Sequence, residues 1–235
     1  GSNKGNSRSI LLFHNIQTVI NHNATLEENA KYKIGIFNKF PFHLYKMENW
    51  DVEHINSNTS NELMDEDTRR EWLANIYLSA EEEDREKIND YFKSNDDEQK
   101  SRIFAQLLER YQEEDKWDEK EKNQIWNYAL LDSSTNRSYG NTIFSGKRRI
   151  IIGKDRGEEV AIPQLTAEGI KMGEKSKSTS SFVPICTKQV FLKYYSISYN
   201  ESNYWTKNDA ERYRTDIEEC LKKLDEPIKL SRDEQ

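Results

Sequence analysis

Apolar side chains recur at helical spacing in several parts of the chain. Those in residues 10–20 fit one face of a helix, which the polar run 21–23 should end because short polar side chains compete for main-chain hydrogen bonds. The clearest stripe lies in 207–224, where Thr206 and Asp209 have the spacing of an N-terminal capping box. The pattern therefore predicts helices near both ends of the chain.

Two short runs have the character of strands instead. Residues 50–55 are rich in β-prone side chains and precede the polar run 56–58, while residues 128–131 precede the polar turn 132–136. A Gly-Asn pair then leads into an apolar and basic segment that we expect to begin a helix. We therefore predict strand, loop and helix in that order after residue 127.

A long acidic segment separates the two predicted strands. Residues 67–116 carry apolar positions three and four apart with acidic side chains on the other faces, as amphipathic helices do. Residues 62–121 hold 21 acidic and 10 basic side chains, a net charge of −11, which leaves +4 elsewhere in a chain whose total is −7. We predict one mostly helical α+β domain. Its parts are a core at 50–58 and 122–156, an acidic helical insertion at 62–121 and a helical, basic part at 157–235, all within a single domain 1–235.

Basic side chains gather in two stretches outside this insertion. Residues 137–156 hold six lysines and arginines against the single carboxylate of Asp155, and residues 171–193 hold five lysines against Glu174. One such run is usually a solvated face, but net charge averages over faces that never meet the same ligand. Two basic stretches beside one predicted site favour a nucleic-acid partner.

The composition excludes several classes of protein. Only 34% of the 235 residues are hydrophobic, and no apolar run approaches the roughly 20 residues of a membrane-spanning helix. There is no secretory signal pattern, so we expect a cytoplasmic protein with no membrane partner. Cys186 and Cys220 are too few for a disulfide framework and lack the spacing of zinc ligands, which makes them ordinary reduced side chains. Gly1-Ser2 resembles a cloning scar, so the chain is expected to be the C-terminal part of a longer polypeptide.

One of the four histidines differs from the others. His14, His22 and His43 have no carboxylate at useful spacing and are expected to be structural or solvated. His54 directly follows Glu53 in the first predicted strand, so a hard anionic oxygen directly precedes a base in the chain. The five tryptophans are expected to anchor the core rather than to stack on bases.

Hydrolysis of a phosphodiester needs a base, oxygen ligands for a divalent ion and positive groups on the phosphate. With an unperturbed pKa of about 6.5, His54 is the natural base. Glu53 and the side-chain carbonyl of Asn136 offer the oxygen ligands that Mg²⁺ prefers. Asn127, nine positions before Asn136, would brace the loop after the first strand. The candidate nucleic-acid-binding residues are Arg137, Asn141, Lys147, Arg148 and Arg149.

These residues resemble the HNH nucleases of the ββα-metal fold, and in particular the C-terminal nuclease domain of GmrSD-type restriction proteins. The spacing of Asn127 and Asn136 is also similar to that in the HNH domain of CRISPR effector nucleases. The stretches that carry the resemblance are Phe40–Tyr45, Asp51–Ile55, Ile125–Leu131 with Asn136 and Asn141, Phe144 with Lys147 and Arg148, and Phe182–Tyr195.

The resemblance implies a ββα core in which 50–55 pairs with 127–131 and the helix after Asn141 completes the metal-binding unit. It makes His54 the general base, Glu53 the first metal ligand, Asn127 the loop-stabilising residue and Asn136 the final ligand, with Asp51 as a substitute or supplement for Glu53. It further implies a DNA endonuclease that uses Mg²⁺ or Mn²⁺ in the restriction of phage DNA. A preceding nucleotide-hydrolysing sensor domain of the same polypeptide would be its partner.

A different class of function stays open beside the nuclease. The same scaffold could serve as a catalytically degenerate HNH-like domain that binds nucleic acid or protein without turnover. The pair Glu53-His54 together with Asn136 separates the two hypotheses, because an abandoned site need not retain these residues.

Overall fold

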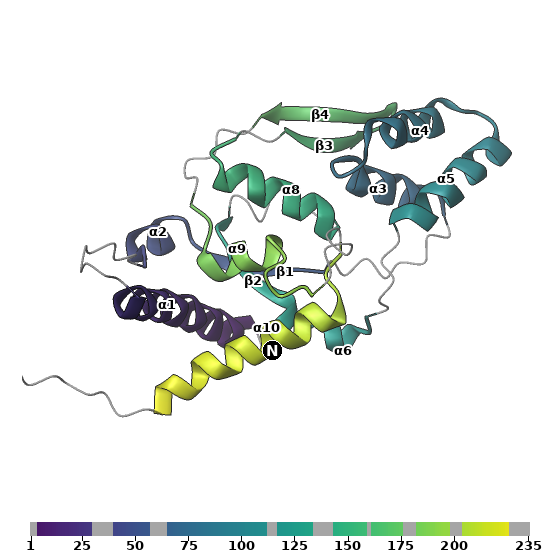
Figure 1. Ribbon diagram of the computed structural model, residues 1–235. Coiled ribbons are helices and arrows are strands. Elements are labelled where there is room, and N and C mark those ends of the chain that lie inside the picture. The colour runs from purple at the N-terminus through teal and green to yellow at the C-terminus, as the bar shows by residue number, and fades with distance from the viewer. Residues whose placement is uncertain are drawn as a thin grey trace, which may run out of the picture.

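The computed structural model describes residues 4–29, 40–56, 65–111, 117–133, 143–158, 161–175, 182–197 and 204–225 of the chain. Most of them are helical, and the described strands form two antiparallel two-stranded sheets (Figure 1). The predicted α+β class and the predominance of helix are confirmed. None of the described helices is long and apolar enough to cross a membrane.

The first sheet joins the two strands that the sequence predicts, β1 (Asp51–His54) and β2 (Tyr128–Leu131). Asp51 lies opposite Leu131 and His54 lies opposite Tyr128. All four residues of β2 are buried. The strands therefore pair directly, and the long acidic segment leaves this sheet and returns to it without coming between them.

Three helices pack around the first sheet. They are α1 (Lys4–Asn29), α9 (Ile185–Phe191) and α10 (Lys207–Lys222), which η3 (Lys223–Asp225) extends. Apolar side chains of these helices and of both strands belong to the larger hydrophobic cluster of the described residues. Helix α10 begins at a capping box made by Thr206 and Asp209, so the helix predicted at 207–224 and its cap are confirmed.

Helix α1 is longer than the sequence pattern predicts. It continues past Asn21 without a break and ends at Asn29. The side chain of Asn21 accepts a hydrogen bond of 2.8 Å from Gln17 one turn earlier, and Thr25 donates to the Asn21 carbonyl. Because these polar groups find partners within the helix, they do not take main-chain bonds away from it. The predicted end of the helix at residues 21–23 is therefore wrong.

The acidic segment folds into helices with a core of their own. Helices α3 (Glu66–Tyr77), α4 (Glu82–Lys93) and α5 (Asp97–Tyr111) enclose a second hydrophobic cluster that includes Trp72 and Tyr91. The short helices α6 (Glu119–Lys122) and η1 (Ile125–Asn127) then lead into β2. In Figure 1 the helices α3 to α5 gather at one end of the molecule, and α1 and α10 lie at the other.

A second strand pair lies in the part expected to be helical and basic. Strands β3 (Ala161–Thr166) and β4 (Gly169–Lys175) form a hairpin that contacts α3 and α4. Gly169 has a φ of 136°, which a side chain would strain, and a Cβ at this position would meet Phe92. Arg70 of α3 donates to the carbonyls of Thr166 and Ala167 in the turn. The hairpin is thus fixed by contacts with the insertion, which a local pattern does not reveal.

Two further helices complete the described elements. Helix α2 (Phe42–Met47) begins directly after Pro41, and α8 (Phe144–Asp155) follows the segment after β2, where the sequence predicts a helix. The expectation that the tryptophans anchor the core holds for those that are buried. These are Trp50, Trp72, Trp117 and Trp205, while Trp126 is partly buried beneath the guanidinium of Arg214.

Candidate functional site

The end of β1 carries the histidine that the sequence singles out. His54 is partly buried, and its ring meets that of Tyr128 edge to face with centroids 4.8 Å apart. Its Nε2 lies 3.4 Å from the Asn123 Oδ1 atom. The tautomer with a hydrogen on Nε2 donates to this oxygen and carries its lone pair on Nδ1. The imidazole is therefore oriented by an aromatic ring and by an amide.

Asn123 is a site residue that the sequence pattern does not indicate. Its Oδ1 also accepts from the Tyr128 hydroxyl at 3.3 Å, and its Nδ2 donates to the Glu119 carbonyl at 2.8 Å. Burial raises the pKa of Tyr128, so the phenol keeps its proton and remains a donor. The only signal in the sequence is that Asn123 stands four positions before Asn127, which alone would not single it out.

Asn127 fastens the chain that follows β1. Its side chain is buried, its Oδ1 accepts from the Asn56 N–H at 2.8 Å, and its Nδ2 donates to the carbonyls of Asn56 and Lys122 at 3.2 and 2.9 Å. Its own carbonyl accepts from the Ile55 N–H. This one amide joins residues 71 positions apart and fixes the backbone directly after His54.

Replacing Asn127 with alanine should therefore destabilise the fold. The change leaves two carbonyls and one N–H without their partner in a buried place, and we expect a loss of about 2–4 kcal/mol in the free energy of unfolding. Urea denaturation measures it. The exposed Asn208 of α10 gives the matched control, because Asn208→Ala should stay within about 0.5 kcal/mol. Equal stability of the two variants would contradict this role of Asn127.

Lys147 connects α8 to the end of β1. The residue is only 1% exposed, and its ammonium donates to Glu53 Oε1 at 2.8 Å and to the His54 carbonyl at 2.6 Å. Phe144 and Ile151 stand three positions before and four positions after it and are buried too, so Lys147 belongs to the inward face of α8. Lys147, which the sequence predicts to bind a phosphate, is thus paired with a carboxylate and a main-chain carbonyl of the protein itself.

The two arginines after Lys147 fasten α8 to its other neighbours. Arg148 is partly buried and donates through Nε to the Phe191 carbonyl at 2.9 Å, and burial lowers the pKa of its guanidinium. Arg149 is exposed, although Nη1 donates to the Leu78 carbonyl at 2.7 Å. Among the described residues predicted to bind nucleic acid, Arg149 is therefore the most accessible to a phosphate. Arg137 and Asn141 lie outside the described residues.

The structure describes two of the three predicted metal ligands. The Glu53 side chain is 16% exposed and shares its Oε1 with Lys147, while Asp51 is exposed and accepts from the Val52 N–H at 2.7 Å. Asn136 lies outside the described residues. Side chains two apart in a strand point to the same face, so both carboxylates lie on one side of β1. Mg²⁺ commonly uses one or two carboxylates and several waters, and Glu53 fits it in donor type.

His14 has a partner that the sequence pattern does not reveal. It is buried, and its Nε2 lies 3.0 Å from Asp216 Oδ2, a partner 202 positions away that no local spacing could indicate. Its buried, paired ring agrees with the structural role expected for it, and Asp216 lies far beyond any local spacing. His22 and His43 are exposed, in agreement with the solvated role expected for them.

The hydrogen bonds at the end of β1 thus bring together His54, Asn123, Asn127 and the pair of Glu53 with Lys147. They connect three parts of the chain, namely the end of β1, the segment from α6 to β2, and helix α8. Comparisons with protein-family models, with curated proteins and with solved structures found no match.

Proposed function

We propose that the chain is a divalent-metal-dependent DNA endonuclease module of the HNH type, which hydrolyses phosphodiester bonds in a restriction or anti-phage system. The observation that carries the proposal is the clamp of Asn127 on Asn56. It holds the chain immediately after His54, where the HNH resemblance requires a loop-stabilising asparagine. The pairing of β1 with β2 and the contact of α8 with β1 through Lys147 support it.

In this proposal His54 takes the proton of the attacking water. Asn123 and Tyr128 hold its ring, which fixes the direction of the lone pair. The buried ammonium of Lys147 forms an ion pair with the carboxylate of Glu53. A divalent ion, when bound, supplies positive charge to the phosphate and to the leaving oxygen. Arg149, exposed on α8, contributes affinity for the DNA backbone that should fall as salt is raised.

One observation favours the alternative of a binding domain without turnover. The ammonium of Lys147 already lies 2.8 Å from Glu53 Oε1, so part of the negative charge that would attract a divalent ion is neutralised by the protein itself. A scaffold that keeps its shape through this ion pair needs no metal. In that case the chain would bind DNA or another protein and leave it uncut.

Plasmid nicking tests the proposal. Supercoiled DNA should be converted to the nicked form with Mg²⁺ or Mn²⁺ and should stay intact with EDTA. Binding of a labelled duplex to the same protein is measured in parallel. A folded, Mn²⁺-loaded protein that retains the duplex but leaves the plasmid intact would contradict the endonuclease and support the binding domain.

A further inference from the structure

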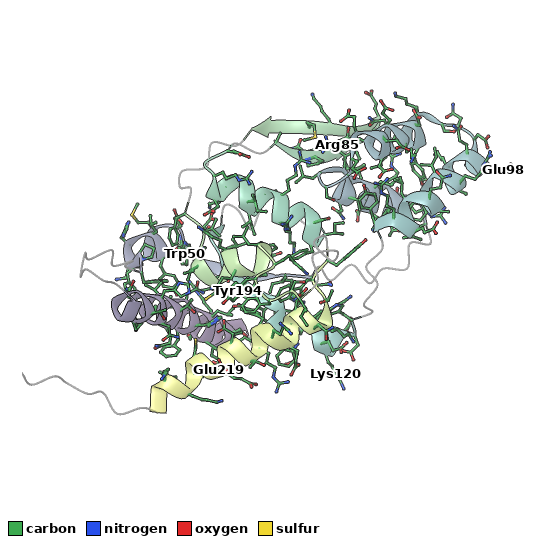
Figure 2. The ribbon with its side chains drawn as sticks, viewed as in Figure 1. Trp50, Arg85, Glu98, Lys120, Tyr194 and Glu219 are labelled. Carbon is green, nitrogen blue, oxygen red and sulfur yellow. The ribbon has the colours of Figure 1, made fainter. Side chains whose placement is uncertain are left out.

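A second group of polar side chains lies between α1 and α10. His14, Asp216 and Cys220 bring an imidazole nitrogen, a carboxylate oxygen and a thiol sulfur within 4.8 Å of one another. Asp216 and Cys220 share one face of α10 because they stand four positions apart. Glu219, labelled on α10 in Figure 2, marks the helical turn that carries Cys220.

His14 is the innermost member of this group. Its side chain is 1% exposed, and one ring nitrogen, Nε2, is paired with Asp216. The other ring nitrogen, Nδ1, is buried and makes no hydrogen bond within the described part of the chain. The Asp216 side chain is 35% exposed, so the group is open to solvent at its carboxylate. Nδ1 is thus without a partner among the described residues on one side of the ring, while Nε2 on the other side faces the accessible carboxylate of Asp216.

We propose that His14, Asp216 and Cys220 bind a zinc ion, with water as the fourth ligand. Nitrogen, sulfur and oxygen donors together suit Zn²⁺, which is borderline soft, and do not suit Mg²⁺ or Ca²⁺, which take oxygen ligands. Three protein ligands and one open position are the arrangement of an accessible zinc site. The inference does not rest on the proposed nuclease function, because none of these residues belongs to the group at the end of β1.

The separation of the imidazole and the carboxylate and the contacts around them fit such an ion. Tetrahedral zinc bonds of about 2.0–2.1 Å place the nitrogen and oxygen ligands about 3.3 Å apart, and His14 Nε2 and Asp216 Oδ2 are 3.0 Å apart. Tyr195 donates to the same carboxylate at 2.6 Å, as an outer residue that orients a ligand does. The ring of Tyr213 packs against the His14 imidazole with centroids 5.6 Å apart and limits its rotation.

Ion binding at this place has a defined proton balance. Burial raises the pKa of the Cys220 thiol, so the sulfur carries its proton when no ion is bound. As the sulfur–zinc bond forms, the thiol proton leaves to solvent. The hydrogen on His14 Nε2 would also leave and Nδ1 would take up one proton, so that the ring binds through Nε2 as neutral imidazole. Without an ion, the hydrogen bonds among His14, Asp216 and Tyr195 would serve only to join α1 to the rest of the core.

Titration with Co²⁺, which reports on the same ligands through its absorption, tests the proposal. The metal-stripped 235-residue protein should bind one Co²⁺ and gain a thiolate-to-cobalt charge-transfer band that Zn²⁺ abolishes. Cys220→Ser should lack the band, and Asp216→Asn should bind cobalt more than about 100-fold more weakly, since loss of an outer-shell residue already costs 10- to 100-fold. Circular dichroism of each metal-free variant verifies its fold, and Asp216→Asn decides the test if Cys220→Ser fails to fold.

Cys186 provides the matched control. It is the other cysteine, is also buried, and donates through its sulfur to the Thr18 hydroxyl at 3.4 Å. Cys186→Ser should keep both the band and the stoichiometry. The proposal is overturned if the wild type shows no charge-transfer band, if the band survives in Cys220→Ser, or if it is lost in Cys186→Ser. These spectra do not depend on DNA cleavage, so the zinc site and the nuclease can fail independently.

Discussion

Replacing His54 with alanine should lower the initial rate of Mg²⁺-dependent plasmid nicking by about 10²- to 10⁴-fold, the contribution typical of a general base. The reason is its place at the end of β1, where Asn123 and Tyr128 orient the ring and Asn127 fixes the backbone that follows. The initial rate of nicking at equal protein concentration measures the effect. The far-ultraviolet circular dichroism of the variant should match that of the wild type, because the ring is only partly buried.

His43 supplies the control for this experiment. It lies on α2 and is exposed, so His43→Ala removes the same ring from a place outside the site and should leave the nicking rate unchanged. Metal-dependent cleavage that survives His54→Ala at the wild-type rate would remove His54 from the mechanism. A loss of activity in both variants would point to a cause other than the base.

Replacing Lys147 with methionine should reduce the free energy of unfolding by about 3–5 kcal/mol, the loss typical when one partner of a buried ion pair is removed. Methionine keeps most of the length of the side chain but withdraws its charge from Glu53 and its hydrogen bond from the His54 carbonyl. The carboxylate, 16% exposed, is then left without its counter-charge. Urea denaturation, with the m-value as a check on two-state unfolding, measures the difference.

The pair of Lys188 and Asp155 gives a matched comparison. Its nitrogen and oxygen are 2.6 Å apart, but the side chains are 39% and 31% exposed, so Lys188→Met should cost less than about 1 kcal/mol. The double change Glu53→Gln with Lys147→Met should recover part of the loss, since no charge is left unpaired. Equal losses for Lys147→Met and Lys188→Met would show that the inner pair contributes no more than a surface one.

Elements with a strong local pattern could be predicted from the sequence. The stripe and capping box of α10 lie within one stretch of chain, and both strands of the first sheet belong to short β-prone runs that end at polar residues. The continuation of α1 through Asn21 could not, because it depends on which partner a polar side chain finds. The β3–β4 hairpin was missed for a similar reason, since Arg70 of α3 holds its turn.

Some residues of the candidate site could likewise be predicted from the sequence, and others could not. Glu53 and His54 could be identified because they are adjacent in the chain, and Asn127 because it lies nine positions before Asn136. Position along the chain does not tell whether a basic side chain points outward, and Lys147 lies on the buried face of α8. The contacts of His14 with Asp216 and of His54 with Asn123 span 202 and 69 positions, so they follow from tertiary packing alone.

The insertion between β1 and β2 has a kinetic consequence. The entropic cost of closing a disordered loop rises with its length, although only by about 0.6 kcal/mol for each doubling. Helices α3 to α5 have their own apolar cluster, so they can collapse before the strands meet and shorten the effective loop. We therefore expect pairing of the strands, and with it assembly of the site around His54, to be a late event whose rate depends on how fast the inserted helices form.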